Sequence, residues 1–143
     1  MAAVRIFEVG PRDGLQNVKS TVPTNTKLGL ISRLIKAGIR MVEITSAVSP
    51  RAIHQLADNI EVLSSNLVQK SLREQPDLRM SCLVPNIKGL GLAAQYKIKE
   101  VAVFVSATEG FSRANINCSV DEGLRRARAV TAKAKEDGLN VRG

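Results

Sequence analysis

Aromatic residues are scarce in this sequence, at 3% of the chain, and tryptophan is absent. A core built from these residues must be mostly aliphatic, which favours Val-, Ile- and Leu-rich parallel strands packed against helices. No apolar run reaches the roughly 18 residues that a membrane-spanning helix requires, so we expect no membrane partner. P-loops, nucleophile elbows and glycine-rich dinucleotide fingerprints are also missing, which excludes three common classes of enzyme site.

Cysteine and histidine are also rare. Cys82 and Cys118 do not have the spacing of a metal-binding pair. Cys82 lies in an apolar run and is interpreted as a core residue, whereas Cys118 lies in a predicted loop. Because no disulfide is needed, the sequence is compatible with a reducing compartment. The only histidine, His54, is interpreted as a solvated helix residue, since no second histidine or paired carboxylate is near it in sequence.

Acidic residues are outnumbered by basic ones, 13 against 21, which gives a formal net charge of +8. Such a surplus suits a nucleic acid, an acidic membrane surface or a phosphate-bearing small molecule. The basic residues are spread through the predicted helices, and few aromatic residues accompany them to stack on bases. We therefore expect no nucleic-acid partner.

An apolar run, Val4–Val9, is followed at once by a polar loop, Gly10–Asn17. A β-branched and aromatic run closed by Gly-Pro is typical of a buried strand that ends in a loop. Arg12 offers a planar fork of donors to a carboxylate, a phosphate or a developing enolate oxygen. Asp13 offers hard oxygen ligands to a divalent cation. The alternative is an ordinary polar turn in which Arg12 is solvated.

Strands and helices are predicted to alternate along the rest of the chain. Further strands are expected at 39–44, 80–84, 101–105 and 139–142, helices at about 25–36, 50–67, 90–96 and 121–137, and polar connections at 69–77 and 106–119. This alternation implies parallel strands with right-handed crossovers. The sequence therefore predicts one α/β domain over residues 1–143. It is either an open doubly wound sheet or part of an eight-stranded barrel, which needs about 250 residues when complete.

Polar residues recur at the ends of the first four predicted strands. They are Arg12, Asp13 and Gln16; Glu43, Thr45 and Ser46; Asn86; and Ser106, Thr108 and Glu109. In either architecture these ends share one face, the usual active-site face. Glu43 lies between two apolar residues, where an unpaired carboxylate is costly to bury. We interpret Glu43 as a site residue that pairs with Arg12 or orients a metal-bound water. The alternative is that it faces outward and pairs with a basic helix residue.

The stretch Val9–Asn17, with the sequence VGPRDGLQN, resembles the opening signature of the 3-hydroxy-3-methylglutaryl-CoA (HMG-CoA) lyase family. Further matches follow in order at 43–46 (EITS), 48–50 (VSP), 84–86 (VPN), 88–89 (KG), 106–109 (SATE) and 115–119 (NINCS). The resemblance covers nearly all 143 residues, and it is nearest to fungal members of the family. It implies a TIM (β/α)8 barrel, of which this chain would hold the first four to five βα units.

The resemblance also implies an activity, the cleavage of HMG-CoA to acetyl-CoA and acetoacetate in leucine catabolism and ketone-body formation. By position, Arg12 matches the arginine that stabilises the enolate, and Asp13 matches a ligand of a divalent cation, Mg²⁺ or Mn²⁺. Gln16 matches a substrate-binding residue and Glu43 a catalytic one. The implied partners are an acyl-CoA substrate and a second copy in a homodimer. The implied location is the mitochondrial matrix, with cytoplasm and peroxisome as alternatives and no transit peptide expected in this chain.

The sequence departs from the family in what it does not contain. The family's other metal ligands are a His-x-His pair and an asparagine, and a later glycine-rich loop carries a reactive cysteine; none of these is present here. Asp13 alone cannot hold a divalent cation well, because such cations take about six ligands. We therefore expect a truncated lyase with little activity by itself and a tendency to self-associate. The alternatives are a non-catalytic half-barrel that binds a partner and a related metal-dependent aldolase.

Overall fold

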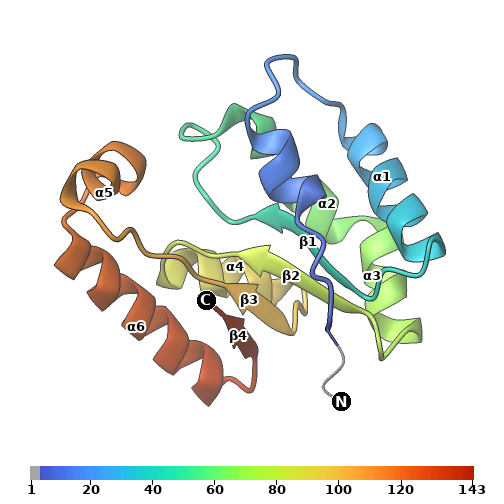
Figure 1. Cartoon of the computed structure of the whole chain (residues 1–143). Coiled ribbons are helices and arrows are strands. Elements are labelled where there is room, and N and C mark those ends of the chain that lie inside the picture. Colours follow the sequence, from blue (N-terminus) through green and yellow to red (C-terminus); the bar gives the residue numbers. More distant parts are fainter. Residues whose placement is uncertain (1–3) are drawn as a thin grey trace.

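The computed structural model describes residues 4–143, in which helices alternate with the strands of one sheet (Figure 1). The strands are β1 (Met41–Ser46), β2 (Arg79–Leu83), β3 (Glu100–Ala102) and β4 (Asn140–Arg142). The helical elements are the π-helical turn η1 (Gly10–Gly14), α1 (Thr24–Lys36), the 3-10 turn η2 (His54–Leu56), α2 (Asn59–Ser64), α3 (Asn66–Glu74), α4 (Ile87–Gln95), α5 (Glu109–Ile116) and α6 (Val120–Glu136).

All strand pairs are parallel, and the order across the sheet is β1-β2-β3-β4. A doubly wound sheet reverses its strand order at a switch point, whereas a barrel adds each new strand beside the previous one. The observed order is therefore that of a barrel segment. Within residues 4–143 the sheet does not close, and β4 forms one of its edges.

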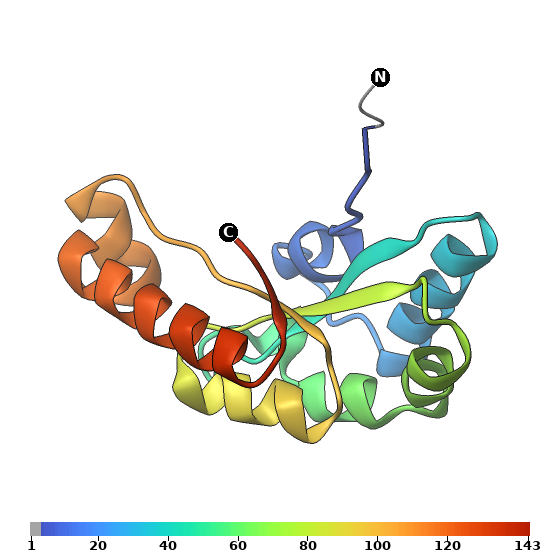
Figure 2. The ribbon, with the colours of Figure 1, turned by 90° about the horizontal axis from the view of Figure 1, so that it is seen from below.

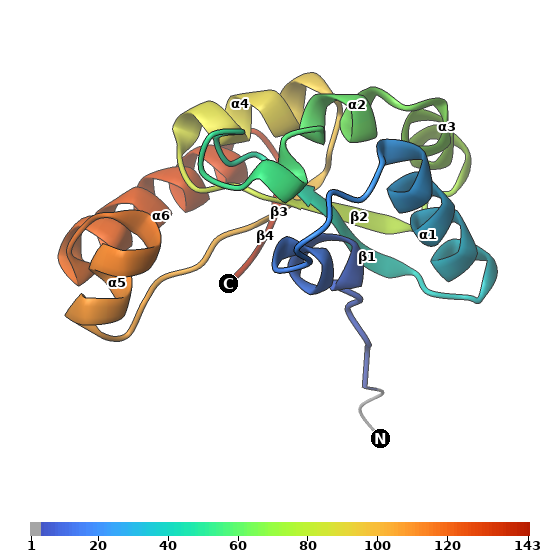
Figure 3. The ribbon, with the colours of Figure 1, turned by 90° about the horizontal axis from the view of Figure 1, so that it is seen from above.

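The core lies between the sheet and the helices that cover it. Figures 2 and 3 show α2, α3 and α4 on one face of the sheet, with the turn η1 on the other. The buried cluster is aliphatic, as predicted, and includes Ile31, Val42, Ile44, Met80, Val84, Leu90, Val101 and Val130. Because parallel strands are covered on both faces, the five residues Val42–Ser46 of β1 are all buried.

The prediction of a buried strand at Val4–Val9 is wrong. Only Glu8 pairs with β1: its N–H donates to the Met41 carbonyl at 2.9 Å, and its carbonyl accepts from Glu43 N at 2.8 Å. Val4 and Ile6 are 93% and 70% exposed. A parallel strand is buried only when it has neighbours on both sides, and here the segment contacts a strand on one side alone.

The predicted helix at 50–67 and the polar connection at 69–77 are also wrong. The structure places η2, α2 and α3 there, and α3 extends to Glu74. The break lies at Ser65, whose hydroxyl accepts from Val68 N at 3.3 Å and so caps α3. Serine favours caps over helix interiors because its hydroxyl bonds to nearby backbone groups.

Two more boundaries differ from the predictions. The expected connection at 106–119 contains α5, which begins after the capping residue Thr108 and ends at Ile116. The next residue, Asn117, has a left-handed conformation (φ 50°). The strand expected at 101–105 ends at Ala102, beyond which Phe104 and Val105 are partly exposed. Among the residues that the structure describes, no helix is long and apolar enough to cross a membrane.

Candidate active site

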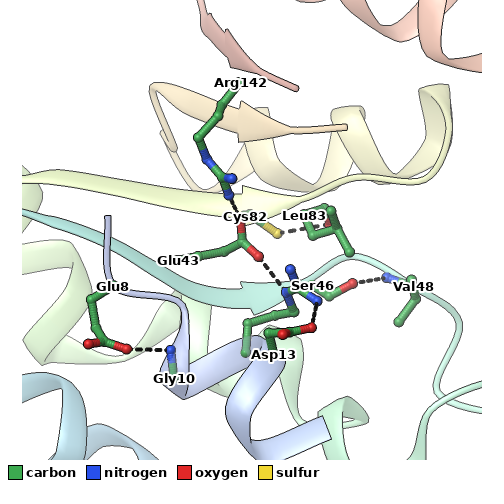
Figure 4. Close-up of polar contacts among 10 residues, drawn as sticks. Glu8, Gly10, Asp13, Glu43, Ser46, Val48, Cys82, Leu83 and Arg142 are labelled. Atoms are coloured by element: carbon green, nitrogen blue, oxygen red, sulfur yellow. Dashed lines mark hydrogen bonds and ion pairs between the residues drawn. The ribbon is translucent and has the colours of Figure 1, made fainter. Parts of the chain in front are cut away.

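The turn after Val9 is stabilised by hydrogen bonds from its backbone N–H groups to the two residues that precede it. The carbonyl of Val9 accepts from the backbone N–H of Arg12 at 3.1 Å and from that of Asp13 at 2.7 Å. The N–H of Gly10 donates to Glu8 Oε1 at 2.6 Å (Figure 4). These bonds fix the backbone from which the Arg12 and Asp13 side chains project.

Arg12 contacts two carboxylates. Its Nε donates to Glu43 Oε1, and its NH1 donates to Asp13 Oδ1 at 2.7 Å. The Glu43 side chain is fully buried, whereas that of Asp13 is 61% exposed. The structure thus contains the predicted contact between Arg12 and Glu43. The alternative, in which Glu43 faces outward to a basic helix residue, is wrong because β1 is buried on both faces.

A second arginine, Arg142, contacts the same carboxylate. Its NH2 donates to Glu43 Oε2, although 99 positions separate the two residues. Its Cζ lies 4.4 Å from the centroid of the Phe7 ring, within cation–π range. Arg142 was not predicted as a site residue from the sequence. The available signal was a charged residue beside Val141 in a predicted strand, the same pattern that identified Glu43.

The two arginines explain how Glu43 is tolerated inside the sheet. A buried carboxylate without partners carries a large desolvation cost, which an opposite charge with good hydrogen bonds can offset. Here each carboxylate oxygen accepts from a different guanidinium. We call these three residues, Arg12, Glu43 and Arg142, the arginine–glutamate triad. Its members come from η1, β1 and β4, so it forms only when the sheet is assembled.

Cys82 lies on β2 beside Glu43 (Figure 4). Burial, together with the smaller effect of the nearby Glu43 carboxylate, raises the pKa of its thiol from 9.0 to about 12. At neutral pH the side chain is therefore a protonated thiol. Because the thiolate is the reactive form of cysteine, Cys82 is not a nucleophile here. This agrees with its interpretation as a core residue.

The other predicted polar residues mostly stabilise local structure. Ser46 Oγ accepts from Val48 N at 3.2 Å, and Asn86 caps α4 by accepting from Gly89 N at 2.9 Å. Thr108 caps α5. Gln16 is half-buried just after η1, on the same short segment as Arg12. The structure therefore brings Arg12, Glu43 and Arg142 into one group, whereas Asn86 and Thr108 act as helix caps.

The carboxylate in contact with Arg12 that a divalent cation could reach is that of Asp13, whose side chain is 61% exposed. Its Oδ1 already accepts from Arg12, and both oxygens of Glu43 are engaged by arginines. Residues 4–143 contain no group of three or more His, Cys, Asp or Glu side chains that could hold a metal ion. Because such cations take six or more oxygen ligands, the described residues alone do not fit one.

Comparison with known proteins gives the same family that the sequence motifs resemble. A family model described as HMGL-like matches residues 3–143. The chain is 48% identical over 140 residues to the cytoplasmic 3-hydroxy-3-methylglutaryl-CoA lyase of Danio rerio, covering 98% of this chain and 40% of that protein. It is 47% identical to the mitochondrial hydroxymethylglutaryl-CoA lyase of Arabidopsis thaliana, covering 98% of this chain and 29% of that protein.

Solved structures show the same relationship. The HMG-CoA lyase of Brucella melitensis superposes with a TM-score of 0.84 at 45% identity, covering 98% of this chain and 48% of that one. An HMG-CoA lyase of Acinetobacter baumannii, solved with coenzyme A and 3-methylmalate, superposes with a TM-score of 0.84 at 28% identity. The match covers 99% of this chain and 45% of that one. The chain thus spans less than half the length of these proteins. The matches confirm the fold class predicted from the sequence.

Proposed function

Because this chain belongs to the HMGL-like family, we propose that it carries part of the active site of an HMG-CoA lyase. The proposed reaction is the cleavage of HMG-CoA to acetyl-CoA and acetoacetate. The observation that carries the proposal is the arginine–glutamate triad, in which a fully buried carboxylate holds Arg12 beside the exposed Asp13. The names of the relatives support the substrate. The activity belongs to the whole lyase, of which this chain supplies the first βα units.

The proposed chemistry explains why an arginine is needed. The tertiary hydroxyl of HMG-CoA loses its proton, its oxygen forms the new carbonyl of acetoacetate, and the adjacent carbon–carbon bond breaks. The bonding electrons pass to the acetyl-CoA fragment as an enolate, which then takes a proton on carbon. Preorganised donors that face a developing oxyanion lower such a barrier. Arg12 has five N–H donors, of which the structure engages Nε and NH1.

Gln16 and Asp13 complete the proposed site. We assign Gln16 to substrate binding, because it is half-buried within one turn of Arg12. We assign Asp13 to one ligand position of Mg²⁺ or Mn²⁺, because its carboxylate is the most accessible one at the site. The remaining ligands would come from later parts of the barrel. When bound, such a cation would add positive charge beside the reacting oxygens.

The family resemblance and the related proteins also support proposals for the partners and the location of the protein. An acyl-CoA substrate is supported by the related lyase solved with coenzyme A. We propose a homodimer, as the family resemblance implies. Relatives include both cytoplasmic and mitochondrial lyases, and we propose the mitochondrial matrix, with a role in leucine catabolism and ketone-body formation. Fractionation of source cells with an antibody against this chain would test the location.

The test of the proposed activity uses the full-length protein that carries residues 1–143. We expect it to release acetoacetate from HMG-CoA, and we expect Arg12→Gln to lower kcat by about 10²- to 10³-fold, the usual cost of one lost oxyanion donor. Arg113→Gln is the matched control, because Arg113 makes only an exposed contact with Glu109 at 3.5 Å. No acetoacetate from the wild type, or equal effects of the two substitutions, would contradict the proposal.

A second candidate is a non-catalytic half-barrel that self-associates. The observation that favours it is an apolar groove of about 610 Å³ beside the β4 edge. Its apolar lining includes Val103, Phe104, Val105, Leu124 and Ala127. The intact mass of the native protein separates the two candidates. A mass near 15.4 kDa would favour the half-barrel, and a mass at least twice as large would favour the lyase.

A further inference from the structure

Arg12 contacts Glu43 through a single nitrogen. Nε donates to Oε1, while NH1 is turned toward Asp13. A guanidinium paired with a carboxylate favours two parallel hydrogen bonds, because its rigid fork matches the spacing of the two oxygens. Left alone, Arg12 and Glu43 would therefore favour a bidentate pair. Such a pair requires Oε2 as well as Oε1.

Oε2 accepts from Arg142. A carboxylate oxygen can accept a second hydrogen bond, but a bidentate pair with Arg12 would bring two guanidinium cations to the same oxygen. This second guanidinium is itself constrained by its surroundings. Its backbone lies in β4, where Arg142 is in register with Ala102 and its carbonyl accepts from Val103 N at 2.9 Å. The ring of Phe7 lies 4.4 Å from its Cζ. The position of Arg142 therefore favours Oε1 over Oε2 as the acceptor for Arg12.

We propose that Arg142 is a positioning residue. By placing a second guanidinium at Oε2 of Glu43, it disfavours a bidentate pair between Arg12 and Glu43 and keeps the other donors of Arg12 free for the substrate oxygen. Arg142 acts through Glu43 and does not itself contact the reacting atoms. The inference rests on the proposed lyase function, because it assigns those free donors to the developing enolate.

The chain contains a matched control for a purely structural role. Arg79 and Glu100 form another arginine–glutamate pair, with Arg79 Nε 2.6 Å from Oε2 of a carboxylate whose residue is 2% exposed. This pair lies at the beginnings of β2 and β3, the opposite end of the strands from the one where active sites of parallel barrels lie. If arginine substitution lowers activity only by destabilising the fold, replacing Arg79 and replacing Arg142 should both lower it. If Arg142 positions Arg12, only the replacement of Arg142 should lower activity.

The kinetic experiment uses the full-length protein that carries residues 1–143, with HMG-CoA as substrate. We expect Arg142→Met to lower kcat at least about tenfold while KM changes less than about threefold, the pattern of an interaction needed mainly in the transition state. Arg142→Lys, which keeps a cation at Oε2, should retain most of kcat. Arg79→Met should change neither constant by more than about twofold. Equal losses of kcat in Arg142→Met and Arg79→Met would overturn the inference.

A double variant separates positioning from packing. Adding Glu43→Gln to Arg142→Met leaves one acceptor oxygen at residue 43, so a bidentate pair with Arg12 cannot form. We expect the double variant to recover kcat severalfold over Arg142→Met alone. A structural role predicts a further loss, because one more buried polar contact is weakened. A double variant less active than Arg142→Met would therefore overturn the inference.

A readout independent of activity completes the test. We expect a crystal structure of Arg142→Met to show Arg12 bound to both oxygens of Glu43. If Arg12 keeps its single contact through Nε, the inference is wrong whatever the activity. If the wild type does not cleave HMG-CoA, the proposed function is wrong, and this structure still decides how Arg142 controls Arg12. Should Arg142→Met not fold, Arg142→Gln, which is polar but uncharged, takes its place in the same comparison.

Discussion

Glutamate is seldom fully buried, and in this chain its burial at position 43 has a specific consequence. The cost of removing the carboxylate from water is offset only while both guanidiniums are in place. Loss of either arginine leaves the buried carboxylate with a single guanidinium, so the cost of its burial is offset less completely. The same residue therefore links the stability of the sheet to the orientation of Arg12.

The buried thiol of Cys82 leads to a prediction about stability in alkaline solution. Its pKa is about 12 in the folded chain against 9.0 when solvated. Above about pH 9 the unfolded chain loses this proton while the folded chain keeps it, so the stabilisation present below that pH is lost progressively up to about pH 12. The loss is on the order of 1 kcal/mol per pH unit above pH 9. We expect urea unfolding of Cys82→Ala to depend less steeply on pH than that of the wild type.

Cys118→Ala is the control for the alkaline experiment, because it removes the other free cysteine of the chain. Comparison of the two variants separates the effect of the thiol at position 82 from the general effect of removing a cysteine. Parallel curves for Cys82→Ala and the wild type would instead mean that the thiol at position 82 is solvated in the folded state.

At the level of elements, α1 is attached to the segment after η2 by a buried ion pair. Lys27 Nζ donates to Asp58 Oδ1 at 2.7 Å and also contacts the carbonyl of Gln55. Thr24 Oγ1 donates to the other carboxylate oxygen of Asp58 at 2.7 Å. Gln55 in turn accepts from Val22 N at 2.9 Å. This cluster therefore anchors the chain between η1 and α1, just after the turn that carries Arg12.

We expect Lys27→Met to destabilise the chain by about 3 kcal/mol, because it leaves Asp58 partly buried without its cation. The measurement is urea unfolding at a concentration where the chain is monodisperse. Lys133→Met is the control: Lys133 pairs with Asp137 at 2.6 Å on the exposed face of α6, where ion pairs contribute little. Similar effects of the two substitutions would mean that the Lys27 pair is effectively solvated.

At the level of the whole molecule, the sheet has open edges. The groove beside β4 is lined by Val103, Phe104 and Val105, and Val4 and Ile6 are exposed beside β1. Unpaired strand edges next to apolar surface favour pairing with another chain. We expect the isolated 143-residue chain to form dimers or larger species, with a concentration dependence measurable by sedimentation velocity.

Substitutions in the groove test this expectation. Val105→Lys places a charge beside the open edge and should shift the chain toward monomer. Phe111→Lys is the control, because Phe111 is also a large exposed apolar residue, 60% exposed, but it lies on α5 and not in the groove. A monomeric wild type at every concentration tested, or equal shifts for both variants, would contradict a role for this edge.

The sequence by itself determined the alternation of strands and helices and the position of the polar turn after Val9. Both depend on local features: apolar periodicity, caps and Gly-Pro boundaries act over a few residues. It failed where a local signal was overlooked, as at Ser65, which divides the helix expected at 50–67, and at Thr108, which begins α5. The assignment of Arg12, Asp13, Gln16 and Glu43 to a lyase site stays a prediction.

The pairing of Arg12 with Glu43 was one of the alternatives that the sequence left open, and only the tertiary structure showed that Arg142 also contacts Glu43. Arg142 and Glu43 are 99 positions apart, and no local pattern predicts their contact. The same holds for Val4–Val9, whose composition is typical of a buried strand but whose burial requires a neighbour on each side. Residues far apart in the sequence can pair across a sheet only after the chain between them has folded back. The sequence around each residue therefore does not show which partner it will meet.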